Sequence, residues 1–233
     1  MADPRYGFMF SGMLVADTMA AFLERIFRLP GDGKPISIID VSGVPSEITS
    51  VVVAVLSRMV FDFAIWSRGE AQRPILLVCE EAHRYIPAGS DSAGGGASSV
   101  GRILSRIAKE GRKYGVSLGL ITQRPSDLAE GVLSQCGTII AMRLNNDRDQ
   151  AFVRAAMPEG ARGFLDAIPA LRNRECIICG EGVAIPIRVS FDALDDDKRP
   201  ASDDPVFSQL WRETGGEGEI IARTLKRWRS QGR

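Results

Sequence analysis

The stretch ILLVCEEAHRYIP, residues 75–87, decides the fold because a short apolar run ends in two adjacent acids. Ile75 to Cys79 has the composition of a strand that is buried on both faces of a sheet. Glu80 and Glu81 follow at the point where such a strand leaves the core. Parallel sheets bind ligands beyond the carboxyl ends of their strands, so these acids are the first candidates for a functional site.

Predicted strands and helices alternate along most of the chain. Apolar, β-branched runs predict strands at residues 36–41, 75–79, 116–122 and 138–144. Helical periodicity predicts helices at residues 17–28, 47–67, 100–114 and 127–135. This alternation predicts an α/β fold with a mainly parallel sheet flanked by helices.

The pattern changes after residue 144. It predicts a helix near residues 147–156, a short helix around Phe164, and a hairpin over residues 175–189 around a Gly-Glu-Gly turn. The Gly-rich residues 89–99 contain no large apolar side chain and are expected to form a mobile loop.

Three segments follow from the composition. A domain is predicted over residues 1–191, an exposed connector rich in Asp and Pro over residues 192–204, and a helical tail over residues 205–233. Within the tail, residues 217–233 combine an apolar stripe with a net charge of +3, from five basic and two acidic residues. We expect this segment to dock on protein, although DNA is also a possible target.

Bulk composition narrows the class of protein. The chain has 233 residues, 45% hydrophobic and 25% charged, which suits one globular domain or a large fragment of one. The formal net charge is zero, so any contact with nucleic acid must come from a local patch. No apolar run of the roughly 20 residues that span a bilayer is evident, and no signal sequence precedes the first helix. We expect a cytoplasmic protein without a membrane partner.

The cysteines do not favour a metal centre. Cys176 and Cys179 form a CxxC, but in a strand their side chains point to opposite faces. His83 is the only histidine, and there is no second CxxC to complete a zinc site. Buried thiols are the expected interpretation, with zinc as the alternative.

Glu80 and Glu81 have the form of a Walker B element. In such an element the acid at the strand end holds Mg²⁺ through water, and the next acid polarises the water that attacks the γ-phosphate of ATP. The alternative is a pair of solvated acids at a strand end. A glycosidase-like acid and base pair is disfavoured, because neighbouring side chains on an extended strand diverge.

Polar residues also end the next predicted strand and the helix before it. Gln123 lies where it could reach the γ-phosphate or the attacking water, and capping a loop is the alternative. Lys109, Arg112 and Lys113 lie in the last turn of the helix, where cations are favourable even without a ligand.

Four stretches together resemble the C-terminal part of the HerA-type ATPase domain, from the HerA/FtsK branch of hexameric P-loop motors. They are LLVCEEAHRYIP, IAKEGRKYGVSLGLITQRPSDL, LSQCGTIIAMRLNNDRDQAFV and RECIICGEGVAIPIRV. The likeness extends upstream through DPRYGFMF and PISIIDVSGVPSE and covers roughly residues 3–200. It implies a RecA-like core in a ring-forming ATPase that translocates double-stranded DNA, paired with a nuclease in end processing or with effectors in phage defence.

The resemblance assigns roles by position. Glu80 would be the Mg²⁺-side acid and Glu81 the catalytic carboxylate, with Gln123 as the sensor. Arg112 would contact nucleotide phosphates, either in its own subunit or across a subunit boundary. Arg124 is a second candidate for contacting these phosphates. His83 matches the EEAH of the family, with a packing or supporting role as the alternative.

One part of the family pattern is missing. A P-loop motor needs G-x-x-x-x-G-K-[ST], whose amides and lysine bind the phosphates, and no stretch of this chain fits. The chain is therefore expected to be the later part of a truncated ATPase domain that is inactive alone. The alternative is a natural short paralogue, a non-catalytic ring or adaptor module that binds DNA or a nuclease.

Three arginines flank the Gly-rich loop and are candidates for DNA contact in a ring channel: Arg84, Arg102 and Arg106. Phosphate contacts by a few such residues would make DNA binding depend on salt concentration. A solvated helix face is the alternative for each of them.

Overall fold

A computed structural model describes residues 18–29, 33–70, 73–89, 99–199, 207–212 and 219–230. The chain forms two compact units, one made of Met1–Val44 with Leu194–Arg233 and the other of Pro45–Ala193. Both sheets lie in Pro45–Ala193, as do the two acids that follow the first strand.

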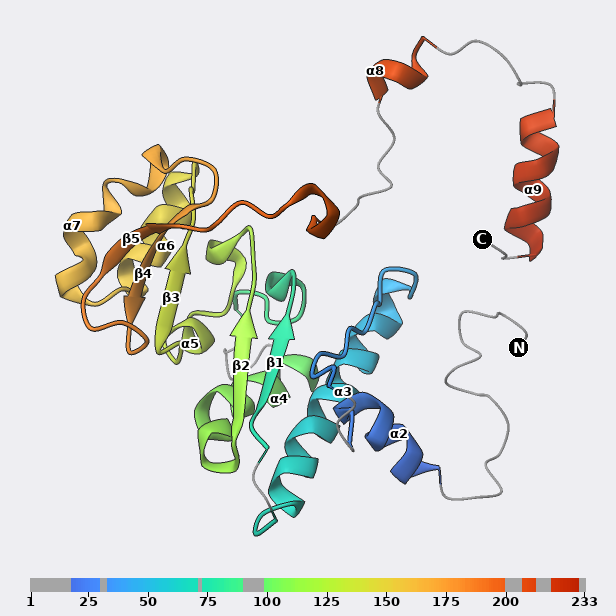
Figure 1. Ribbon diagram of the computed structural model, residues 1–233, viewed down its shortest axis with the longest axis horizontal. Coiled ribbons are helices and arrows are strands. Elements are labelled where there is room, and N and C mark those ends of the chain that lie inside the picture. The colour runs from blue at the N-terminus through green and yellow to red at the C-terminus, as the bar shows by residue number, and fades with distance from the viewer. Residues whose placement is uncertain are drawn as a thin grey trace. The chain divides into compact units, whose positions relative to one another are not determined.

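The helices and strands alternate within the unit Pro45–Ala193 (Figure 1). Their order is α3 (Ser46–Trp66), β1 (Ile75–Cys79), α4 (Ser99–Glu110), β2 (Val116–Leu120), α5 (Glu130–Leu133), β3 (Thr138–Ala141), α6 (Asp147–Ala156), α7 (Arg162–Leu165), β4 (Glu175–Gly180) and β5 (Ile187–Ser190). The other unit contains α2 (Met19–Phe27), α8 (Phe207–Leu210) and α9 (Ile220–Ser230).

The α/β class is confirmed, with a parallel sheet and flanking helices. The predicted helices at residues 17–28, 47–67 and 147–156 correspond to α2, α3 and α6. The predicted hairpin corresponds to the antiparallel pair β4 and β5, and the predicted tail contains α8 and α9. The predicted helix at 127–135 is reduced to a 3-10 turn at Pro125–Asp127 and the single turn α5.

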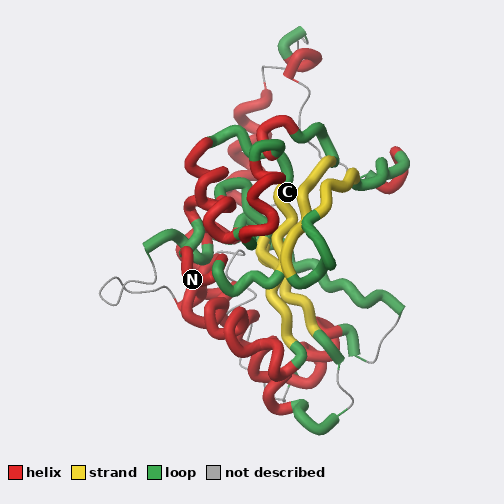
Figure 2. The backbone as a smooth tube through the Cα atoms, turned by 90° about the vertical axis from the view of Figure 1, so that its left-hand side faces the viewer, coloured by secondary structure: helices red, strands yellow, loops and turns green. Residues whose placement is uncertain are grey.

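Strands β1 and β2 form the parallel sheet. Ile75 is paired with Val116 and Cys79 with Leu120, so the two strands end at the same edge. Helices α3 and α4 pack on each other and on these strands, and Figure 2 shows helices running along one side of the strands. Phe61 of α3 and Leu104 of α4 are fully buried there. Burying a side chain of this size contributes about 1.5–3 kcal/mol.

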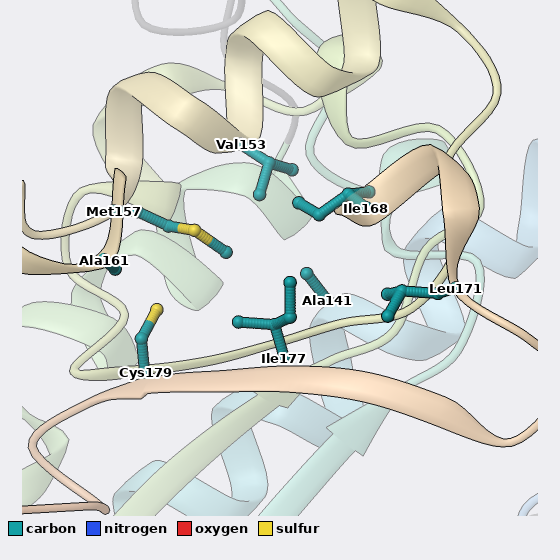
Figure 3. Packing of buried hydrophobic residues seen from close by; sticks show 8 residues of the cluster. All are labelled: Ala141, Val153, Met157, Ala161, Ile168, Leu171, Ile177 and Cys179. Carbon is teal, nitrogen blue, oxygen red and sulfur yellow. The ribbon is translucent and has the colours of Figure 1, made fainter. Parts of the chain in front are cut away.

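Strands β3, β4 and β5 form a separate antiparallel sheet. Helix α6 and the turns that follow it cover one face of this sheet, and their apolar side chains converge on β3 and β4 (Figure 3). The cluster comprises Ala141, Val153, Met157, Ala161, Ile168, Leu171, Ile177 and Cys179. Cys179 is thus a buried apolar thiol, and no group of metal-binding side chains occurs among the described residues.

Two predicted strands differ from the expected parallel arrangement. Residues 36–41 belong to no strand, and Ile36 and Ile38 are exposed. The run 138–144 forms β3, but it pairs antiparallel with β4 rather than in parallel with β1 or β2. Apolar composition predicts a strand but carries no information about its partner, because partner choice is set by tertiary contacts.

Helix α3 corrects one sequence-based expectation. Residues Ile48–Trp66 have a mean hydropathy of 1.9, which is long and apolar enough to cross a bilayer by length and composition. Core helices pass the same test, and α3 buries Phe61 against α4. Its exposed face carries an ion pair between Arg58 and Asp62 at 2.6 Å. Only 22% of this segment is buried within the described residues, so α3 has one buried face and is otherwise largely exposed.

We predict that Gly180→Ala destabilises the protein. Gly180 ends β4 with φ +107°, and a Cβ there would overlap the Gly137 carbonyl oxygen and lie 2.9 Å from Thr138 Cα. The backbone conformation alone costs a non-glycine residue about 1–3 kcal/mol. Chemical denaturation measures the loss. Gly160→Ala is the matched control, because no atom lies within 4 Å of a Cβ at Gly160, and an equal loss in both variants would contradict this account.

Candidate functional site

The carboxyl ends of β1 and β2 bring the predicted site residues together. Beyond the sheet register, the Ile121 amide donates to the Cys79 carbonyl at 3.0 Å, and the Ala82 amide donates to the Ile121 carbonyl at 2.9 Å. These two bonds hold the segment after β1 against the segment after β2. Glu80 and Glu81 lie between Cys79 and Ala82, so their backbone is fixed on both sides.

Glu81 has an unusual backbone conformation. Its φ of 51° and ψ of 43° lie in the left-handed region, which costs a non-glycine residue about 1–2 kcal/mol. It immediately precedes the 3-10 turn Ala82–Arg84, whose Ala82 is fully buried. Strained residues of this kind occur where the surrounding structure imposes them, and they are frequent at functional sites.

Two side chains contact the Glu81 carboxylate. Gln123 Nε2 donates to Oε1 at 3.3 Å, although 42 positions separate these residues in the sequence. His83 Nε2 lies 3.5 Å from Oε2. Glu81 remains 38% exposed, so its carboxylate is held by neighbours and still accessible to a substrate.

The segment after β2 is itself ordered by a hydroxyl. Thr122 Oγ1 accepts a hydrogen bond from the Arg124 amide at 3.0 Å and lies 3.0 Å from His83 Nδ1. His83 therefore contacts Thr122 with one ring nitrogen and faces Glu81 with the other.

The donors present fit a hydrated magnesium ion. Mg²⁺ keeps several waters and is usually bound through one or two carboxylates together with substrate phosphates. Glu80 is exposed beside Glu81 at the strand end, and the Cys79 thiol beneath them adds no charge, since burial raises its pKa to about 11. Glu80 would hold such an ion through water.

Comparisons with known proteins identify the family. A family model described as "Helicase HerA, central domain" matches residues 1–60. The DNA double-strand break repair helicase HerA of Pyrococcus furiosus is 41% identical over 116 residues, which cover 50% of this chain and 20% of the relative. The probable DNA double-strand break repair helicase HerA of Methanocaldococcus jannaschii is 32% identical over 159 residues, covering 68% of this chain and 29% of the relative. These sequence matches support a HerA-type P-loop ATPase.

The chain spans between 20% and 39% of the length of the curated relatives it matches. Among solved structures, the genome packaging NTPase B204 from Sulfolobus turreted icosahedral virus 2, in complex with AMPPCP, has a TM-score of 0.45 and 15% identity. That match covers 61% of this chain and 63% of the viral protein. The family assignment rests on the sequence matches alone.

The two arginines predicted to contact nucleotide, Arg112 and Arg124, lie at opposite ends of β2. Arg124 follows Gln123 directly and lies 3.8 Å from Asp127, with its guanidinium largely exposed. Arg112 lies in the 3-10 turn Gly111–Tyr114 that precedes β2, at the opposite edge of the sheet. At about 3.3 Å per residue, the length of β2 puts about 13 Å between those edges. Arg112 therefore does not join Glu81 within one chain.

The three candidate DNA-contacting arginines also differ. Arg84 and Arg102 are exposed. Arg106 pairs with Glu110 at 3.2 Å and stacks over the Phe61 ring at 5.0 Å, which is a structural role on the face between α4 and α3. Most of the Gly-rich loop they flank, residues 90–98, lies outside the described residues.

One supporting contact was not anticipated from the sequence. Asp149 in the first turn of α6 is buried and accepts a hydrogen bond from the Ser126 amide at 3.0 Å. This contact ties the loop that carries Gln123 to α6. The only signal in the sequence is an acid near a helix start, which is too common to identify a partner.

We predict that Asp149→Ala lowers the free energy of unfolding by about 1–3 kcal/mol, because the buried Ser126 amide loses a charged acceptor. Urea denaturation of the chain measures this. Asp147→Ala is the control, since Asp147 is exposed in the same turn of α6 and shares the helix-end effect of about 0.3–1 kcal/mol. Similar losses for both variants would show that the Ser126 contact contributes little.

Proposed function

We propose that this chain contributes the hydrolytic part of an ATP site in a HerA-type motor that moves along double-stranded DNA. The contact between Glu81 and Gln123 supports this best, because an acid and an amide from two parallel strand ends meet at 3.3 Å. A strand-end acid beside a polar residue of the neighbouring strand suits phosphoryl transfer to water.

Each residue has a defined task in this proposal. Glu81 accepts the proton of the attacking water, and its exposed carboxylate leaves room for that water. Gln123 holds Glu81 in position and lies near the place of the γ-phosphate. Glu80 would hold Mg²⁺ through water, and a bound ion would neutralise charge on the phosphates.

The phosphate-binding loop of this site would come from residues outside the chain. The sequence contains no G-x-x-x-x-G-K-[ST], and its curated relatives are several times longer than the matched region. The retention of Glu80, Glu81 and Gln123 favours a part of a motor over a module that has given up hydrolysis. A non-catalytic adaptor that binds DNA or a nuclease is the competing function.

The proposal extends to assembly and partners. Because Arg112 lies at the far edge of the sheet, it would serve the ATP site of a neighbouring copy, as in a ring of six subunits. Four relatives are named as DNA double-strand break repair helicases, which supports double-stranded DNA as the substrate. Arg84 and Arg102 are the proposed DNA contacts, a nuclease is the proposed partner, and the cytoplasm is the proposed location.

We predict that Glu81→Gln in the complete gene product slows ATP turnover by about 10²–10⁴-fold, because the general base is lost. ATP binding should be unchanged, since the substitution preserves shape. Steady-state turnover and nucleotide binding measure the two effects separately. Glu130→Gln, an exposed acid in α5, is the matched control and should keep full turnover. An unchanged rate for Glu81→Gln would remove Glu81 as the base.

The intact mass of the native gene product tests whether the site is completed elsewhere. We predict a mass well above the 25.3 kDa of this chain, with additional peptides that include a Gly-rich loop ending in Lys-Ser or Lys-Thr. Intact mass spectrometry of the untagged protein from its source cells measures this. A mass equal to that of this chain would instead support the adaptor function.

A further inference from the structure

We infer that His83 and Thr122 form a positioning relay for Glu81, linking this carboxylate to the loop that carries Gln123. The relay deepens the proposed function, and its role in ATP turnover rests on that function. The geometry of the relay does not depend on the proposed function, because its contacts form without any ligand. These contacts involve the side chains of Thr122, His83, Glu81 and Gln123.

The four residues form a closed ring of contacts. Thr122 Oγ1 lies 3.0 Å from His83 Nδ1, and His83 Nε2 lies 3.5 Å from Glu81 Oε2. Glu81 Oε1 accepts from Gln123 Nε2 at 3.3 Å, and Gln123 is bonded through the backbone to Thr122. Oε1 of Glu81 is therefore oriented directly by Gln123, and Oε2 is oriented by Thr122 through His83.

The chemistry of these groups determines which atom is the donor and which is the acceptor in each contact. An ionised carboxylate only accepts, so a neutral His83 must carry its proton on Nε2, facing Glu81. Its Nδ1 is then an acceptor for the Thr122 hydroxyl proton. The Thr122 oxygen in turn accepts the Arg124 amide at 3.0 Å. Each donor in this series of contacts thus has an acceptor: the Arg124 amide donates to Thr122, the Thr122 hydroxyl to His83, and His83 Nε2 faces Glu81.

Burial separates the supporting residue from the reactive one. The His83 side chain is 17% exposed, whereas that of Glu81 is 38% exposed. A residue that only fills space would need no polar partner for its ring nitrogens. The two nitrogens of His83 instead face Thr122 Oγ1, which follows β2, and Glu81 Oε2, which follows β1. The 3.5 Å separation from Glu81 is long, and contacts of catalytic groups often shorten only when substrate binds.

The relay predicts the tautomer of a single, identifiable side chain. His83 is the only histidine among the 233 residues, so an isotope-labelled sample of this chain gives one imidazole signal by NMR. At a pH where that signal shows the ring to be neutral, we expect the proton on Nε2 and an acceptor Nδ1. A neutral ring with its proton on Nδ1 would overturn the relay without any variant being made.

Matched variants test the two contacts of the ring. Thr122→Val removes the hydroxyl at Nδ1 and should shift that nitrogen signal, and Glu81→Gln should shift the Nε2 signal. Thr138→Val is the control, because Thr138 Oγ1 also accepts a backbone amide, from Gly182 at 3.0 Å, and lies on β3. An imidazole spectrum that is the same in Thr122→Val, Glu81→Gln and wild type would overturn the proposal.

Turnover in the complete gene product separates positioning from general structural support. His83→Gln should lower kcat at least tenfold and leave KM for ATP unchanged. In a Glu81→Gln background the same substitution should have no further effect, because His83 acts only through Glu81. A further loss in that background would overturn the positioning role. If the protein shows no ATP turnover at all, the proposed function fails while the tautomer measurement still decides the relay.

Discussion

The parallel pairing of β1 with β2 is the constraint on which the site depends. It places Cys79 opposite Leu120, and two further backbone bonds carry the pairing past the ends of the strands. A shift of one residue would turn every side chain of β1 to the other face of the sheet. It would also move Glu81 away from Gln123, so the register of the sheet and the geometry of the site are set by the same bonds.

The energetics of the site balance local strain against contacts. The left-handed backbone of Glu81 costs about 1–2 kcal/mol. The hydrogen bond from Gln123 is 3.3 Å long and exposed to solvent, so it offsets only part of this strain. The left-handed conformation of Glu81 turns the chain from β1 directly into the buried Ala82. It also brings His83 beside Glu81.

The sheet also decides which charges can cooperate within one chain. Arg124 follows the edge that carries Glu81, whereas Arg112 precedes β2 at the other edge. Sequence distance gives the opposite impression, since Arg112 is closer to Glu81 along the chain than Arg124 is. Direction along a parallel strand, and not proximity in the sequence, determines the edge on which a residue lies.

The sequence by itself determined the α/β class, most helix positions, the strand that ends in Glu80 and Glu81, and the family. Those features follow from local composition, periodicity and the order of motifs. The structure decided that the run 138–144 pairs antiparallel with β4 and that residues 36–41 lie outside any strand. It also decided the contacts of Glu81 with His83 and of Ser126 with Asp149. Strand partners, backbone strain and hydrogen bonds between distant residues depend on three-dimensional packing, which local residue patterns do not encode.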